Sequence, residues 1–457
     1  MQPIPAHTFD ELRQQFPEFI YHGFQVQKGT HSLKVQYDFE LPGFCHFRPE
    51  MEFPERAFIH TSLLDNTALD NLLFHIGMIE LISYWKATCS PIVRIKPYKL
   101  DAPQIEWWKH LYYQGLGEFF YVNNIMADPA TFMQIESDAA TGVTAVSHQV
   151  MNDILVPVGG GKDSVVTLEL LKKQGFPIRP LIMNPRGATI ATAAVAGFEL
   201  NDCLVINRSI DPQLLRLNQQ GFLNGHTPFS ALLAFSCILA GALTGSGSIA
   251  LSNEASADEA TIKGTTINHQ YSKSFEFEKD FTEYTSKYIS KNIRYFSFLR
   301  PLHEIQIAKI FSRFPQYFPV FKSCNVGSKT DTWCGSCAKC LFAYIILSPF
   351  IAEEKLVAIF GHDLLNNESL LSYFNELCGI SENKPFECIG TINEVNQALK
   401  MTLAQRTTLP TLLKYYQNHP QYQSLQNTCT PGLSEGTAEQ HFLSKEHFQI
   451  IKRAIND

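Results

Sequence analysis

The stretch GGGKDS, residues 159–164, combines a bare backbone with a lysine, an aspartate and a serine. An apolar run at 154–158 precedes it, and the amphipathic segment VVTLELLKKQ follows it. Backbone N–H groups in a loop between a strand and a helix bind phosphate, and the positive end of the helix adds to this. The sequence therefore predicts an anion site formed by Gly159, Gly160, Gly161, Lys162, Asp163 and Ser164.

Two familiar phosphate-binding loops do not fit this spacing. A Walker loop needs a glycine, four residues and then Gly-Lys-Ser/Thr. Here Asp163 follows the Gly-Lys pair, and Val156 stands where the first glycine is needed. The dinucleotide fingerprint would place its third glycine at Ser164. The loop therefore binds phosphate in another way, or it is a glycine-rich turn without a ligand.

Four cysteines are spaced like metal ligands rather than like core residues: Cys324, Cys334, Cys337 and Cys340. The last three follow a C-x2-C-x2-C pattern. Four thiolates that converge make a closed tetrahedral zinc site, which pins two segments together and has no open position for chemistry. An iron–sulfur cluster is the rival interpretation, because soft thiolates also hold iron. Free thiols or a redox pair remain a third possibility.

Alternating strands and helices must position these residues. We expect strands at four apolar runs, namely 154–158, 178–183, 203–207 and 248–254. A helix follows the glycine loop, and a buried helix is expected over 228–243. This alternation predicts an α/β fold with a doubly wound parallel sheet.

Further elements flank that sheet. Residues 21–41 alternate apolar and polar side chains around KGTHS, which predicts a hairpin. Helical periodicity marks 68–86 and 104–126, and the small polar stretch 137–150 is the best linker. We therefore expect three parts: an N-terminal α+β domain over 1–150, a nucleotide-binding domain with the cysteine site over 151–345, and a helical region over 346–457.

Charge and composition narrow the class of protein. The 457 residues carry a formal net charge of −7, which argues against a protein that coats nucleic acid. The first residues show neither the basic nor the apolar part of a secretory signal. The longest apolar run, 231–243, is too short to span a bilayer. We expect a cytoplasmic protein without a nucleic-acid or membrane partner.

The loop resembles the SGGxDS loop of the PP-loop ATP pyrophosphatases, with Gly159 in place of the family's serine. Those enzymes cleave ATP between the α and β phosphates and adenylate a substrate oxygen. The resemblance implies ATP with Mg²⁺, and an adenine nucleotide alpha hydrolase-like fold. FLRPLHEIQIAKIFSRFP, ahead of the cysteines, resembles the end of the 7-cyano-7-deazaguanine synthases, where a cysteine set holds structural zinc.

Five segments spread along the chain resemble the UDP-N-acetylmuramoyl-L-alanyl-L-glutamate epimerases of the MurL type: IELISYWKATCSP, VPVGGGKDSVVTLE, INHQYSKSFEFE, WCGSCAKCLF and KPFECIGT. The resemblance implies conversion of the terminal L-glutamate of a UDP-linked muramoyl dipeptide to D-glutamate, with ATP consumed to AMP and diphosphate. Another PP-loop enzyme, acting on a deazapurine carboxylate or on tRNA, is the alternative. A non-catalytic ATP-sensing protein is the third.

Adenylation suits an epimerase, because it removes the carboxylate charge and so acidifies the α-carbon. Lys162 and Asp163 would then act on the nucleotide. Two further groups must exchange the proton on opposite faces. The candidates are Cys89, His226, Glu254, Asp258, Glu259 and Cys388. The acidic ones follow a predicted strand, where active sites of open α/β sheets lie, and the cysteines have precedent in cysteine-based racemases.

Overall fold

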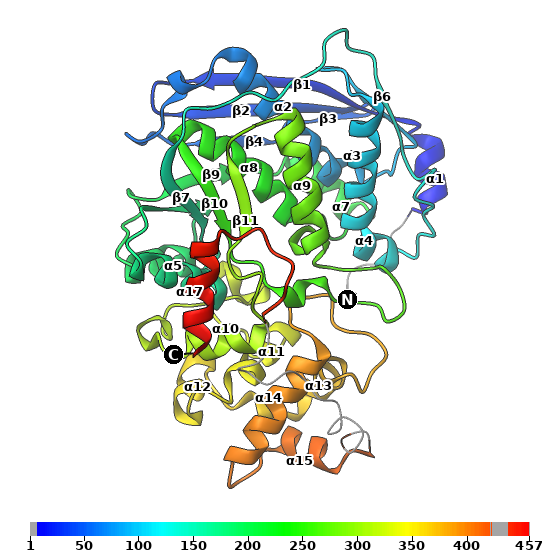
Figure 1. Ribbon diagram of the computed structural model, residues 1–457. Helices are drawn as coiled ribbons and strands as arrows, with labels where there is room; N and C mark the ends of the chain where they lie inside the picture. Colours follow the sequence, from blue (N-terminus) through cyan, green and yellow to red (C-terminus); the bar gives the residue numbers. More distant parts are fainter. Residues whose placement is uncertain (1–6, 421, 423–436, 457) are drawn as a thin grey trace. The chain divides into compact units, whose positions relative to one another are not determined.

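The computed structural model describes residues 7–420, 422 and 437–456 (Figure 1). The described chain divides into two compact units. Unit 1 holds the residues up to Leu155 together with Leu204–Ile249 and Glu276–Tyr295, and unit 2 holds Val156–Cys203, Ala250–Phe275 and the residues from Phe296 onward. The predicted division into three domains stays a prediction.

Unit 1 contains a sheet in the order β9-β4-β2-β1-β5-β6, with β3 paired to β2. Its strands are β1 (Glu18–Lys28), β2 (Leu33–Leu41), β3 (Cys45–Phe47), β4 (Glu50–Phe53), β5 (Ile92–Ile95), β6 (Gln134–Ser137) and β9 (Leu204–Arg208). β1 and β2 are antiparallel, which confirms the predicted hairpin. Every second side chain of β2 is buried, as its alternating sequence requires.

The helices of unit 1 are α1 (Phe9–Gln15), α2 (Asn66–Trp85), α3 (Ala102–Gly115), α4 (Gly117–Val122), α7 (Pro212–Gln219), α8 (Phe229–Thr244) and most of α9 (Phe275–Tyr288). The predicted helices at 68–86 and 228–243 are confirmed, and the helical stretch predicted at 104–126 forms two helices, α3 and α4, which end at Val122. α2 packs against α8 and β1. A Cβ at Gly77 would lie 1.9 Å from the Tyr21 hydroxyl oxygen, so this close approach of helix to strand requires glycine.

A second group of four strands includes the one that ends at the glycine loop, and three of the four run from unit 1 into unit 2. Their order is β11-β10-β7-β8, from β7 (Met151–Pro157), β8 (Ile178–Met183), β10 (Ser246–Leu251) and β11 (Arg294–Ser297). The chain passes between the units within β7, β10 and β11. β7 and β10 are parallel, and the backbone N–H of Val158 donates to Leu181 at 2.8 Å. The strands predicted at 154–158, 178–183, 203–207 and 248–254 correspond to β7, β8, β9 and β10, so these four predictions and the α/β class are confirmed. The doubly wound topology stays a prediction.

Helices make up most of the remainder of unit 2: α5 (Lys162–Lys173), α6 (Gly187–Val195), α10 (Glu304–Phe311), α11 (Ala338–Leu347), α12 (Glu353–Phe360), α13 (Leu371–Cys378), α14 (Ile392–Gln405), α15 (Thr411–Asn418) and α17 (Lys445–Asn456). The buried helix α11 contacts α10, α12, α13 and α14. The predicted helical character after 345 is confirmed (Figure 1). None of the described helices is long and apolar enough to cross a membrane.

Short 3-10 turns connect these elements: η1 (Thr61–Leu63), η2 (Ala255–Asp258), η3 (Tyr271–Lys273), η4 (Pro315–Tyr317), η5 (Val326–Lys329), η6 (Leu364–Asn366) and η7 (Glu368–Leu370). Two of them matter for the site. η2 follows strand β10, and η3 precedes helix α9, so both lie in the segment between these two elements.

Candidate active site and metal site

The glycine loop joins the end of β7 to the start of α5. Gly160 has a φ of +82°, and a Cβ there would lie 3.1 Å from the backbone of Ala188 and Thr189 at the start of α6. Gly161 is the N-cap of α5, and among the described residues no side chain caps this helix. The backbone N–H of Lys322 donates to Gly160 at 2.8 Å. The bare loop is therefore held between two other segments by its backbone.

Lys162 is buried, and its ammonium group is held by two carboxylates. It lies 2.5 Å from Asp163 and also forms an ion pair with Glu304, the first residue of α10. Burial lowers the pKa of Lys162, but the two carboxylates outweigh this and raise it. Burial also disfavours the charged form of Glu304 and so raises the pKa of that carboxyl group. The positive charge of Lys162 offsets only part of the rise. The Asp163 side chain remains 33% exposed, so it is the member of this group that a ligand can reach.

Glu254 lies just beyond β10 and is 4% exposed. Burial and the nearby charge of Asp163 raise its pKa, against the opposing charges of Lys273, Lys162 and Arg300. Of the acidic residues predicted to follow this strand, Glu254 is one whose pKa responds to the loop residues Lys162 and Asp163. Its role stays a prediction.

The other two acids of this segment have structural partners. Asp258 accepts a hydrogen bond from the backbone N–H of Phe275, at the start of α9, at 2.8 Å. It also lies 3.9 Å from the guanidinium of Arg300. Glu259 forms an ion pair with Lys384. Both carboxylates therefore hold the segment in place.

Cys388 lies between α13 and α14, and its thiol is hydrogen-bonded to Lys273 and His269. Burial raises the pKa of this thiol, but Lys273, the bond to His269 and Lys339 outweigh it and lower the pKa to about 5. Burial disfavours the charged form of Lys273, but the negative charges of Cys388 and Glu254 outweigh this effect. The pKa of Lys273 is therefore raised. The group is therefore a thiolate beside an ammonium at neutral pH.

Cys89 and His226 belong to unit 1, whereas the loop, Glu254 and Cys388 belong to unit 2. Cys89 is fully buried with a φ of +51°, and burial raises the pKa of its thiol well above the usual range. The imidazole Nδ1 of His226 lies 3.7 Å from a carboxylate oxygen of Glu118.

Lys86 is a further buried cation of unit 1. Burial lowers the pKa of Lys86 to about 8, and its ammonium donates to the Gly225 carbonyl at 2.5 Å.

Three residues of this site escaped the sequence reasoning: His269, Lys273 and Glu304. The first two stand in INHQYSKSFEFE and the third in FLRPLHEIQIAKIFSRFP, both quoted above for resemblance alone. The signal in the sequence that could have indicated these three residues is the presence of titratable side chains within segments that already resembled known families.

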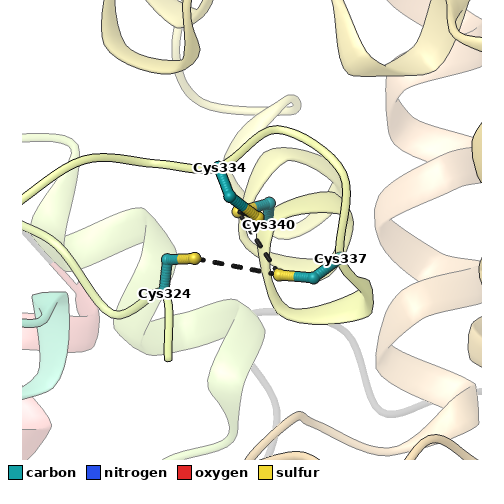
Figure 2. A group of neighbouring side chains, drawn as sticks. All are labelled: Cys324, Cys334, Cys337 and Cys340. Atoms are coloured by element: carbon teal, nitrogen blue, oxygen red, sulfur yellow. Dashed lines mark hydrogen bonds between the residues drawn. The ribbon is translucent and has the colours of Figure 1, made fainter. Parts of the chain in front are cut away.

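The four cysteines form one cluster, and Figure 2 shows their sulfurs turned toward one another. Sγ–Sγ distances are 3.9 Å for Cys324–Cys337, 3.6 Å for Cys334–Cys340 and 3.5 Å for Cys337–Cys340. All four sulfurs lie within 4.8 Å of one another. A tetrahedral ion with Zn–S bonds of about 2.3 Å needs sulfurs roughly 3.8 Å apart. The predicted cluster is confirmed, and its geometry could hold zinc.

Comparison with known proteins gives two matches that together span most of the chain. The MurL N-terminal domain matches residues 10–298, and the MurL C-terminal domain matches residues 320–427. Three similar proteins are each named UDP-N-acetyl-alpha-D-muramoyl-L-alanyl-L-glutamate epimerase. That of Xanthomonas oryzae pv. oryzae is 34% identical over 348 residues, which cover 74% of this chain and 76% of the relative.

The other two relatives come from Micromonospora sp. and Salinispora tropica. The Micromonospora sp. protein is 32% identical over 346 residues, covering 74% of this chain and 76% of its own. The Salinispora tropica protein is 34% identical over 339 residues, covering 73% of each chain. Both similarities extend over most of this protein's length.

Replacing Gly160 should destabilise the loop. Gly160→Ala places a Cβ against the α6 backbone in a left-handed conformation, at a cost of about 1–3 kcal/mol. The matched control is Gly159→Ser, because a Cβ at Gly159 meets no atom of the described chain within 4 Å. Urea denaturation checks both, and equal stability of the two variants would contradict the geometry.

The cysteine cluster predicts a metal content. The purified protein should contain about one zinc per chain. Cys337→Ser should lose it and melt lower by at least ~5 °C, because metal binding contributes to folding. Cys378→Ala, a buried thiol outside the cluster, is the control and should keep the zinc. Metal-free protein whose melting is unchanged by Cys337→Ser would refute the site, and a brown, iron-containing protein would indicate an iron–sulfur cluster instead.

Proposed function

The chain belongs to the MurL family of epimerases, and from this premise we propose that it inverts its substrate by way of an acyl adenylate made from ATP. The substrate is UDP-N-acetylmuramoyl-L-alanyl-L-glutamate, a peptidoglycan precursor, and the product carries D-glutamate in the terminal position. Family membership favours this function over a deazaguanine-synthase-like enzyme and over an ATP-sensing protein.

The acidity of the α-proton explains why ATP is needed. Beside an ionised carboxylate, loss of this proton would create a dianionic enolate. In the proposed reaction a carboxylate oxygen attacks the α-phosphorus of ATP. The bond between the α-phosphorus and the oxygen that bridges it to the β-phosphorus breaks, and diphosphate leaves. The resulting mixed anhydride carries no carboxylate charge, so its α-proton is much more acidic. The α-carboxylate is the one activated, because it is bonded to the carbon that inverts.

Inversion then needs two carriers and one water. A base takes the α-proton from one face, and an acid returns a proton to the opposite face. Water hydrolyses the anhydride, which releases AMP and the free carboxylate of the D-isomer. ATP cleavage drives the sequence in one direction, since diphosphate and AMP both leave.

The observation that carries the proposal is the uncapped start of α5 behind the glycine loop. Backbone N–H groups at such a helix start bind phosphate oxygens. Asp163 stands at this point with its carboxylate accessible, whereas Lys162 is held inward by Glu304. The loop thus offers N–H groups and one carboxylate to a bound nucleotide.

Magnesium fits the carboxylates near the loop. The repulsion between Glu254 and Asp163 contributes to the raised pKa of Glu254, and a divalent cation would relieve it. Carboxylate oxygens and phosphate oxygens are the ligands that Mg²⁺ prefers. We infer that Asp163, with Glu254 behind it, would hold Mg²⁺, which would supply charge for the departing diphosphate.

The nucleotide products test the adenylation step. In the presence of the UDP-linked dipeptide, ATP should yield AMP and diphosphate. Asp163→Asn should lower the rate of diphosphate release at least ~100-fold while the protein stays folded, because Glu304 still pairs with Lys162. Glu199→Gln, a change at an exposed carboxylate of the same unit, is the control. Release of ADP and phosphate would contradict adenylation, and full activity of Asp163→Asn would move the nucleotide site elsewhere.

Solvent deuterium tests the proton chemistry. In D₂O the product should carry deuterium at the α-carbon of its glutamate, because the returned proton comes from a carrier that exchanges with solvent. Recovered substrate should stay mostly unlabelled, since each face has its own carrier. An ATP analogue with a methylene group between the α and β phosphates should abolish incorporation. Product without deuterium at this carbon would exclude deprotonation, and label that appears without ATP would show that adenylation is unnecessary.

A further inference from the structure

We propose that Cys388 is one of the two proton carriers of the epimerisation, with Lys273 and His269 as the residues that position its thiolate. This inference rests on the proposed function, and it assigns a residue to one of the two faces of the activated glutamate. The first support is geometric. Cys388 meets Lys273 and His269, which lie more than a hundred positions earlier in the chain.

The loop that carries Cys388 is fixed to the segment that carries Lys273. Ile262 and Asn383 form an antiparallel bridge, and the backbone N–H of Lys384 donates to Thr261 at 3.2 Å. The side-chain amide of Gln270 donates to the Ile389 carbonyl at 2.9 Å. The two loops are thus joined along their length, and the thiolate is held in one position, as a proton carrier requires.

The charges around Cys388 separate it from the core cysteines. Lys273 and His269 face it from one loop and Lys339 faces it from α11, while Glu387 precedes it. Burial raises the pKa of Cys378 to about 12, so that thiol is protonated in the core. Cys388, in contrast, is only partly buried as a residue, and its thiol has charged partners. The thiolate is the form of a cysteine that takes a proton.

Two sets of contacts join Cys388 to the glycine loop. Lys273 interacts with both Cys388 and Glu254, and the charge of Asp163 in turn acts on Glu254. Gly390 lies against Glu304, since a Cβ there would be 3.1 Å from the Cβ of Glu304. Glu304 is the ion-pair partner of Lys162. Cys388 therefore belongs to the same charged cluster as the loop proposed to bind ATP.

A buried acceptor beside Cys388 indicates a ligand. Gln270 is 4% exposed, and its Oε1 has no hydrogen-bond partner among the described residues. Leaving a buried acceptor unpaired costs about 1–3 kcal/mol. The peptide N–H between alanine and glutamate in the substrate is a donor that would satisfy it. That contact would place the glutamate α-carbon, which is bonded to this nitrogen, near the thiolate.

The proposed step conserves protons and electrons. The thiolate of Cys388 takes the α-proton and becomes a thiol, and the electron pair of the C–H bond enters the enolate of the activated glutamate. The second carrier gives its proton to the opposite face. Afterwards the thiol loses its proton to solvent, and the second carrier regains one. Lys273 stays an ammonium throughout and stabilises the thiolate form.

Replacing the thiol should separate the two halves of the reaction. Cys388→Ser and Cys388→Ala should lower epimerisation by roughly 10²–10⁴-fold, while diphosphate release with substrate stays within about tenfold of wild type. Cys378→Ala is the matched control and should leave both rates unchanged. Epimerisation near the wild-type rate in Cys388→Ala would overturn the proposal. If wild-type enzyme epimerises without releasing diphosphate, adenylation fails, and loss of α-deuterium exchange in Cys388→Ala would still support the carrier.

Alkylation tests the thiolate in the wild-type protein and so does not depend on how the variants fold. Iodoacetamide should modify Cys388 at a rate that is nearly constant above pH 6 and falls as the pH drops through about 5, where the thiol becomes protonated. Peptide mass spectrometry reads this residue separately from Cys378. A rate that rises only near pH 8–9, as for an ordinary thiol, would overturn the proposal.

Lys273 variants test the positioning role. Lys273→Gln should move the alkylation midpoint of Cys388 toward ~8.5 and lower kcat more than it changes KM. Lys273→Arg keeps the positive charge and should restore part of kcat and the low midpoint. An unchanged midpoint in Lys273→Gln would refute this role, because a merely structural residue would not shift the titration of the thiol.

Discussion

The buried ion pair between Lys162 and Glu304 is the interaction on which the candidate site depends. Taking an ammonium and a carboxylate out of water costs several kcal/mol for each ion, so neither side chain could occupy this position without the other. The pair joins the first residue of α5 to the first residue of α10. It also turns Lys162 inward and leaves Asp163 facing outward, although the two are neighbours in sequence.

The cysteine cluster lies next in the chain to the segment that contacts the glycine loop. Lys322 donates its backbone N–H to Gly160, and Ser323 lies against Gly161. The next residue is Cys324, a member of the cysteine cluster. Cys337 and Cys340 belong to the start of α11, which contacts α10. A zinc ion here would therefore fix the segment that holds the glycine loop, without taking part in chemistry.

The environment of each cysteine, rather than its residue type, separates the thiols of this chain. Cys89 is fully buried, and burial holds its thiol protonated although the charges of Arg13 and Lys86 oppose this. Cys388 has the same intrinsic chemistry, yet Lys273, His269 and Lys339 hold it as a thiolate. Because of this difference in environment, we propose Cys388 and not Cys89 as a proton carrier.

The sequence by itself determined the features that short windows encode. Period-2 and helical patterns located β2, α2 and α8, the glycines located the phosphate-type loop, and C-x2-C-x2-C located the cysteine cluster, because each depends on near neighbours in the chain. Only the tertiary structure decided the partners: Glu304 for Lys162, and Lys273 with His269 for Cys388. These residues lie more than a hundred positions apart, and no local pattern encodes such a meeting. The charge state of a buried side chain follows from its partners, so it was fixed by the fold and not by the residue type.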